Sequence, residues 1–270
     1  MAERADALPP FLERSDTDFM GLSDSIERVI RRLETRRALS EEDRNAIRAL
    51  PFTYRTLEAS TYMVREGEPP QICTILLSGF AYRHKITEKG ARQILSLHLP
   101  GEFLDLQNSM LEVADHNVQT LTRAEIAAVP VTALHRLVTE HPAVARAMWI
   151  DTLVDAAIFR EWLVNVGRRD SHSRIAHLLC EFALRLEMAG LASHYRYELP
   201  MTQEQIADCT GLTPVHVNRV LKDLGRQGLI SRERRSVAIA NWEGLSHAGD
   251  FNSRYLHYEE GGPGEAALAS

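Results

Sequence analysis

Cysteine is scarce in this chain, since its 270 residues include only Cys73, Cys180 and Cys209. The three lie far apart and are odd in number, so the sequence has neither a disulfide framework nor the paired spacing of a metal site. It also lacks the clustered cysteines that hold iron–sulfur clusters, and none of its eleven histidines has a diagnostic setting for a metal. We therefore predict no metal site and no cofactor.

Long apolar runs are missing as well. No segment approaches the roughly 20 apolar residues that a membrane-spanning helix needs, and the first residues, MAERADALPPFLERSD, do not have the pattern of a secretory signal. The sequence also has no nucleophile elbow, no phosphate-binding loop and no Gly-rich cofactor turn. We therefore expect a cytoplasmic protein without membrane contact and without enzymatic activity.

The net charge of −6 is unevenly distributed along the chain. Residues 168–240 contain 11 Lys or Arg against 8 Asp or Glu, whereas the remainder contains 20 against 29. A basic segment on an acidic body confines attraction for phosphate groups to one part of a protein. The excess is modest, so affinity for nucleic acid would rest on a few placed residues and on dimerisation.

The most informative pattern lies between residues 201 and 230. Gln203–Cys209 has helical spacing, Gly211 stands where a tight turn needs a left-handed residue, and Thr213 and Pro214 suit the start of a second helix. A basic turn, RERRS, follows between two short apolar runs. The pattern predicts a winged helix-turn-helix.

The second helix of this motif has two different faces. Its apolar face consists of Val217, Val220, Leu221 and Leu224. The opposite face offers His216, Asn218, Arg219 and Lys222, which is the chemistry of a helix that lies in the major groove of DNA. An ordinary helical hairpin is the alternative. It is less favoured because Ala207, Gly211, the Thr213 cap and the basic face have the spacing of a helix-turn-helix.

Two other sequence patterns precede the motif. From Pro51 to Pro130, short apolar runs alternate with turns such as EGEPP, EKG and LPGE, which predicts a compact β-barrel or β-roll. Residues 142–166 then form one long helix with two apolar faces, so the helix must pack on two sides. The face with coiled-coil spacing is predicted to form the dimer seam and comprises Ala147, Ile150, Val154, Ala157, Glu161 and Val164. The second face comprises Trp149, Leu153, Ala156 and Leu163.

These patterns predict an α+β protein with an N-terminal, jelly-roll-like β-roll, a long central dimerisation helix and a C-terminal winged helix-turn-helix. The expected parts are a flexible segment (1–22), a β-roll effector-like domain with flanking helices (23–140), the dimerisation helix (141–167), the DNA-binding domain (168–245), and an extension with a flexible tail (246–270).

This order of parts resembles the Crp/Fnr family of bacterial transcription regulators over roughly residues 30–245. The resemblance is carried by EGEPP, LLSG and LPGEFLDL in the β-domain and by TQEQIADCTGLTPVHVNRVLKDLGRQGLI in the DNA-binding module. It implies a homodimer that binds double-stranded DNA at a two-fold symmetric operator and contacts RNA polymerase.

The resemblance also implies roles for single residues. Arg219 matches the family's base-contacting arginine, which can donate two hydrogen bonds to a guanine edge. Base contacts are also expected from Asn218 and from Val215, which stands where many members have a glutamate. Phosphate or flanking contacts are expected from Thr202, Gln203, Thr213, His216, Lys222, Arg234 and Arg235.

The effector site departs from the family pattern. Members that bind cyclic AMP have a Gly-Glu pair followed about ten residues later by Arg-Ser or Arg-Thr. Gly101 and Glu102 are present, but His116 and Asn117 stand about where the arginine is expected. These four residues are the candidate effector pocket, although Gly101 and Glu102 fit a structural turn better. A buried cyclic phosphate without a permanent cation would be poorly compensated.

We therefore predict a sequence-specific DNA-binding transcription regulator that does not depend on cyclic AMP, with an unknown effector. The alternative that stays open is a regulator that is inactive until a cyclic nucleotide or another small molecule binds. A winged helix that serves only as a protein-interaction module is disfavoured by Arg219, Lys222 and the RERRS turn.

Overall fold

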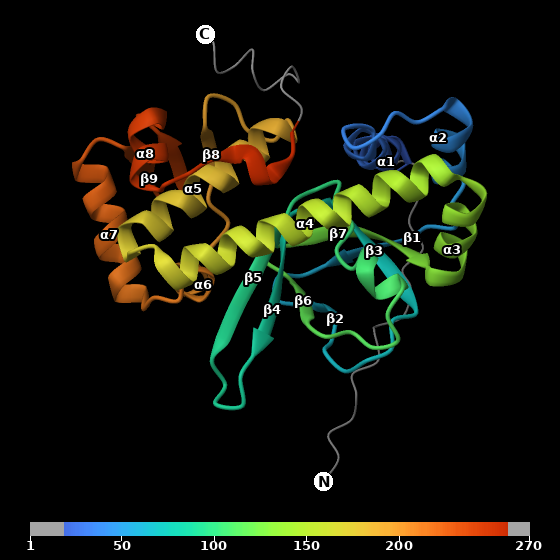
Figure 1. The fold of residues 1–270 in the computed structure, drawn as a ribbon, viewed down its shortest axis with the longest axis horizontal. Helices are drawn as coiled ribbons and strands as arrows, with labels where there is room; N and C mark the ends of the chain where they lie inside the picture. Colours follow the sequence, from blue (N-terminus) through green and yellow to red (C-terminus); the bar gives the residue numbers. More distant parts are fainter. Residues whose placement is uncertain (1–18, 259–270) are drawn as a thin grey trace.

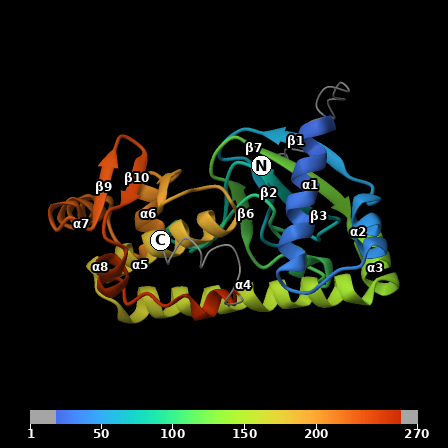
Figure 2. The same ribbon diagram turned by 90° about the horizontal axis from the view of Figure 1, so that it is seen from above.

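One 27-residue helix, α4 (Pro142–Arg168), runs along the whole molecule and connects its two halves (Figures 1 and 2). The structure, a computed structural model, describes residues 19–258. Of the flexible segment predicted for residues 1–22, residues 1–18 lie outside this range and residues 19–22 begin a helix. Residues 259–270 of the predicted tail also lie outside the described range. Among residues 19–258, no helix has the length and apolar character to cross a membrane.

Seven strands form the predicted β-roll. They are β1 (Thr53–Leu57), β2 (Tyr62–Val64), β3 (Ile72–Ser78), β4 (Ala81–Ile86), β5 (Arg92–His98), β6 (Asn117–Thr120) and β7 (Ala124–Pro130). Antiparallel pairing gives one sheet of order β1-β7-β3 and one of order β2-β6-β4-β5. Leu76, Leu104, Val118 and Ile126 belong to one apolar cluster of this domain. Ile75 and Leu77 belong to a second cluster with residues of α1 and α3, so β3 is buried on both faces.

Helices flank the roll on one side. They are α1 (Phe19–Glu34), α2 (Glu41–Arg48), α3 (Val131–Glu140) and the short 3₁₀ helix η2 (Leu106–Ser109). Ser40 caps α2 by accepting a hydrogen bond from the Asp43 amide, and Asp43 in turn accepts one from the Ser40 amide. The apolar side of α1 is buried and consists of Ile26, Val29, Ile30 and Leu33.

The C-terminal module occupies the other end of α4 (Figure 2). It contains α5 (Ser171–Met188), β8 (Arg196–Glu198), α6 (Gln203–Thr210), α7 (Pro214–Arg226), β9 (Ile230–Glu233), β10 (Ser236–Ile239), α8 (Trp242–Ala248) and the 3₁₀ helix η3 (Ser253–Leu256). The three strands form a small sheet of order β8-β10-β9. Helix α5 is buried from residue 175 to residue 186 and is the centre of this module.

Helix α4 corrects the predicted assignment of its two faces. Ala147, Val154 and Ala157, which were expected at the dimer seam, are buried against the chain's own domains. Ile150 and Glu161 are partly buried, and Val164 is exposed. On the face expected to pack internally, Trp149, Leu153 and Leu163 are 68%, 53% and 70% exposed, whereas Ala156 is partly buried. The small alanines lie on the face that packs on its own chain, and the large side chains point outward.

An ion cluster joins the two halves beside α4. The Glu102 carboxylate lies 3.1 Å from Arg185 of α5, 3.1 Å from Arg32 of α1 and 3.1 Å from Nδ1 of His98. Asp151 of α4 also binds Arg32, at 3.2 Å. Burial alone would raise the pKa of Glu102, but Arg32 and Arg185 outweigh burial and hold this pKa well below its usual range. The carboxylate therefore stays charged and binds α1 and α5 together.

Two fully buried histidines predict how stability depends on pH. Burial lowers the pKa of His84 and of His177 from 6.5 to about 4. The unfolded chain binds protons near pH 6.5, whereas the folded chain resists them until about pH 4, so stability is full above pH 6.5 and falls as the pH decreases towards 4. We expect each histidine to lower the free energy of unfolding by about 2.5 kcal/mol between about pH 7 and pH 4.5, measured by urea unfolding.

The variant His84→Leu provides the control for this prediction. Among the described residues, neither ring nitrogen of His84 has a hydrogen-bond partner. Leucine therefore removes the titration without breaking a bond, and the variant should lose His84's share of the pH dependence. An unchanged difference in stability between the two pH values would contradict the assignment.

Candidate DNA-binding surface and effector pocket

Local side-chain bonds define the turn between α6 and α7. Thr202 caps α6 by accepting from the Gln205 amide at 3.2 Å, and the Gln205 side chain accepts from the Thr202 amide at 2.8 Å. Gly211 ends α6 in the left-handed conformation, with φ 65° and ψ 36°. Thr213 then caps α7 by accepting from the His216 amide at 3.3 Å. The sequence pattern of caps and glycine thus sets the angle between the two helices.

Helix α7 presents its polar face to the outside. Its apolar residues Val217, Val220, Leu221 and Leu224 are buried, which leaves Val215 80% exposed and Arg219 and Lys222 exposed. A shallow hollow of about 380 Å³ brings this face together with the start of α6, and it is lined by Gln203, Pro214, Val215, Asn218, Arg219, Lys222 and Arg226. Arg219 donates a hydrogen bond of 2.9 Å to Nε2 of His216, which orients its guanidinium group.

The wing contributes further basic groups near this surface. Arg234 and Arg235 form the exposed turn between β9 and β10, and Arg234 has a positive φ of 55°. The wing strands and α7 occupy the same end of the molecule (Figure 2). The structure therefore gathers the ten predicted DNA-contact residues at one end, although the hydroxyls of Thr202 and Thr213 are engaged as helix caps.

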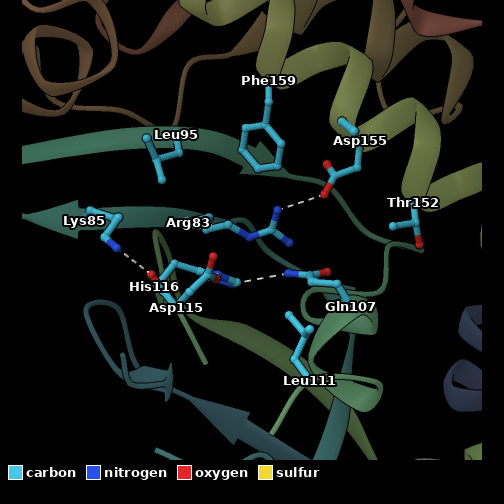
Figure 3. Close-up of a pocket in the computed structure, with 11 residues that line it drawn as sticks. Arg83, Lys85, Leu95, Gln107, Leu111, Asp115, His116, Thr152, Asp155 and Phe159 are labelled. Carbon is cyan, nitrogen blue, oxygen red and sulfur yellow. Dashed lines mark hydrogen bonds and ion pairs between the residues drawn. The ribbon is translucent and has the colours of Figure 1, made fainter. Parts of the chain in front are cut away.

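A separate pocket of about 370 Å³ lies between the β-roll and α4 (Figure 3). Its lining consists of Arg83, Lys85, Leu95, Gln107, Leu111, Asp115, His116, Thr152, Asp155, Ala156 and Phe159. Arg83 donates to Asp155 at 2.8 Å and to the Leu104 carbonyl at 2.7 Å. Lys85 lies 2.7 Å from Glu66 and donates to the Asp115 carbonyl at 2.8 Å. Both cations are already paired.

His116 adds no positive charge to this pocket near neutral pH. Burial and the neighbouring Arg83 lower the pKa of His116, although Asp115, at 2.5 Å from Nδ1, opposes this change. The pocket therefore contains two cations, Arg83 and Lys85, and two carboxylates, Asp115 and Asp155. An anion entering it would have to displace an existing ion pair.

The structure does not bring the four predicted effector residues together. His116 lines the pocket of Figure 3, and Asn117 accepts a hydrogen bond from the Glu66 amide at 3.1 Å. Glu102 instead lies in the ion cluster with Arg185, because its carboxylate faces the C-terminal module. Gly101 precedes it with φ 97° in a tight turn, as the structural alternative expected.

Of the seven polar residues that line the pocket, only His116 was predicted from the sequence. Gln107 lies 3.3 Å from Nε2 of His116, and Arg83 pairs with Asp155 across 72 positions of the chain. The arginine in the middle of the strand AYRHKI was the available signal, because a buried strand seldom contains a charge without a partner. Nothing in the sequence indicated that its partner lies on the long helix.

The comparisons with known proteins match both halves. Residues 54–141 match the family described as "Cyclic nucleotide-binding domain", and residues 173–248 match "Crp-like helix-turn-helix domain". A "Probable transcriptional activator" of Rhizobium leguminosarum bv. viciae is 26% identical over 77% of this chain and 83% of its own length. "Transcriptional activator protein FnrL" of Cereibacter sphaeroides is 27% identical over 73% and 81%. The solved structure of FixK2 from Bradyrhizobium japonicum, 24% identical, has the same fold with a TM-score of 0.68 and covers 74% of this chain and 98% of its own.

The turn of the helix-turn-helix predicts opposite effects for two glycine substitutions. In Gly211→Ala, the new methyl group would lie 3.5 Å from Arg174, an ordinary contact, so the cost comes from the left-handed backbone. We expect a loss of about 1 kcal/mol in the free energy of unfolding, measured with urea. In Gly225→Ala, at a helical position where the new methyl group would make only an ordinary contact, 3.9 Å from the Ile230 carbonyl oxygen, we expect a gain of about 0.5 kcal/mol. Equal effects of the two substitutions would contradict this account of the turn.

Proposed function

We propose, since the chain belongs to the Crp/Fnr family of transcription regulators, that it acts as a homodimer and binds a two-fold symmetric operator through α7. The observation that carries the proposal is the outward face of α7, where Val215 is 80% exposed and Arg219 and Lys222 are exposed. Such a face matches the width and hydrogen-bonding pattern of the DNA major groove. Contact with RNA polymerase belongs to the same proposal.

The residues on α7 divide into two roles. Arg219, oriented by His216, suits the two acceptors of a guanine edge, whereas Val215 suits the methyl group of thymine. Lys222 and the wing residues Arg234 and Arg235 suit phosphates, because they are exposed cations without a fixed geometry. Sequence specificity therefore depends on Arg219 and Val215, whereas the salt-sensitive part of the affinity depends on Lys222 and the wing arginines.

The second subunit is expected on the exposed face of α4. Trp149, Leu153, Ala156 and Leu163 follow the steps of four and three that a two-stranded coiled coil uses, continued by Arg160. Three of these apolar side chains are more than half exposed in one chain. Large apolar side chains that share one helix face favour burial against another protein surface, and an identical helix supplies the matching stripe.

The pocket of Figure 3 supports independence from cyclic AMP. Its two cations are paired with carboxylates or carbonyls, and the pKa of His116 is lowered, so no free cation awaits a cyclic phosphate. Asp155 and Asp115 would repel the phosphate. A neutral or zwitterionic small molecule would fit this pocket better, which keeps ligand gating as the second candidate.

Selection of bound sequences from a random DNA pool, without added ligand and at physiological salt, tests the function. A two-fold symmetric motif is the expected outcome. If sequences are enriched only after cyclic AMP is added, independence from cyclic AMP is wrong. If none is enriched under either condition, the proposed DNA recognition is wrong for the isolated protein.

The variant Arg219→Ala should lose discrimination at one base pair and at its symmetry mate. We expect a loss of about 1–3 kcal/mol of preference per half-site, because the guanine acceptors lose two donors. The measurement compares binding to the selected operator and to operators mutated at that base pair.

Lys222→Ala is the matched control on the same helix face. It should weaken all sequences similarly and reduce the slope of log affinity against log salt by about one per subunit. A loss of sequence preference in Lys222→Ala, or its retention in Arg219→Ala, would overturn the division of roles.

If the exposed face of α4 forms the dimer interface, a charge placed on that face should weaken the dimer. Leu153→Asp and Leu163→Asp should shift the protein to monomers in sedimentation equilibrium, because two carboxylates would face each other in an apolar seam. Val215→Asp, at an exposed apolar position on α7, should leave the dimer intact while it weakens DNA binding. Dimers that persist in both α4 variants would exclude this seam.

A further inference from the structure

A second, more basic cavity lies where α1, the turn after β5 and the end of α5 meet. Its volume is about 440 Å³. Arg28, Arg31 and Arg32 of α1 and Arg185 of α5 line it, together with Glu102. It shares no lining residue with the pocket of Figure 3. Neither the family assignment nor the proposed DNA recognition gives this cavity a role.

The four arginines differ in the ion pairs that they form. Arg32 and Arg185 hold Glu102, at 3.1 Å each. Within residues 19–258, Arg28 and Arg31 form no ion pair, and Arg28 donates only one long hydrogen bond, of 3.4 Å, to the Leu77 carbonyl. They are three positions apart on one helix and therefore lie on the same side of it. The cavity thus has two neighbouring arginines that form no ion pair with the described residues, although Arg31 also helps to lower the pKa of the nearby Glu27 carboxyl.

The backbone conformation of Gly101 allows Arg28 to pack closely against the turn after β5. Gly101 has φ 97°, and a Cβ atom at this position would lie 3.1 Å from Cγ of Arg28. Glycine therefore permits the arginine stem to lie close against the turn, which limits the directions that its guanidinium can take. This is the close approach for which glycine is suited.

The remaining wall of the cavity is apolar and aromatic. It includes Leu99, Pro100, Met188, Ala189 and Tyr258, with Thr35 and Gly190 completing the lining. The guanidinium of Arg36 lies over the ring of Tyr258, 5.5 Å from its centre, and helps to hold it in place. One side of the cavity thus suits an anion and the other suits a small organic group.

We propose that this cavity binds a small organic phosphate, with the phosphate on Arg28 and Arg31 and the organic part against Met188 and Tyr258. A phosphate dianion matches two unpaired guanidinium groups in charge and in hydrogen-bond geometry, whereas a single carboxylate would neutralise only one. The volume is within the range of small-molecule sites. Binding here does not depend on DNA recognition by α7.

Isothermal titration with phenyl phosphate and with inorganic phosphate tests the proposal on the full chain without DNA. We expect phenyl phosphate to bind at one site per chain and at least ten-fold tighter than inorganic phosphate. The double variant Arg28→Gln and Arg31→Gln should lose at least ten-fold in affinity for phenyl phosphate. Two controls should bind as the unmodified protein does: Arg37→Gln, an exposed arginine outside the cavity, and Lys85→Gln in the pocket of Figure 3.

Three results would overturn the proposal. They are no binding of phenyl phosphate, equal affinity for phenyl and inorganic phosphate, and unchanged binding in the double variant. A cooperative thermal unfolding transition in the double variant, similar to that of the unmodified protein, ensures that lost binding is not lost folding. Since the assay contains no DNA, a failure of the proposed operator recognition would leave its result unaffected.

Discussion

The Glu102 carboxylate is the group on which the arrangement of the two halves depends. It is 4% exposed, and its partners come from α1, from α5 and from the last residue of β5. A buried charge of this kind is tolerated only while its partners surround it, so the ion cluster contributes little net stability but penalises other domain positions heavily. A change in the angle between the β-roll and the C-terminal module would separate Glu102 from Arg185, which would leave Glu102 with Arg32 and Arg185 with Glu181 as their remaining charged partners.

Helix α4 connects this ion cluster with the other functional surfaces. Asp151 belongs to the cluster, Asp155 and Phe159 line the pocket of Figure 3, and Leu153 lies on the exposed face. These four side chains fall within three turns of one rigid element. A ligand in the pocket of Figure 3 and a second subunit would therefore act on the same helix, and the second cavity is connected to it through Arg32 and Asp151. This arrangement provides a physical route for coupling between them.

Sequence reasoning succeeded where the determinants are local and failed where they are distant. The helix-turn-helix depends on caps, a glycine and an apolar period within about thirty residues, so it could be recognised directly. The partner of Glu102 lies 83 residues away and that of Arg83 lies 72 away, and no local pattern indicates either pairing. On α4 both faces are apolar, so the periodicity predicted two packed faces. It could not show which face packs on its own chain and which is left exposed.

The extension after β10 also ties distant parts of the chain together. Arg36, just after α1, donates to the carbonyls of Leu256 at 3.4 Å and His257 at 3.2 Å, and Tyr255 donates to Glu181 of α5 at 2.7 Å. During synthesis, α1 emerges from the ribosome more than two hundred residues before these partners exist. The β-roll can collapse early and Glu102 can meet Arg185 once α5 exists, but the contacts of Arg36 with the extension must wait until residue 257 has been added, so this part of the domain junction forms last.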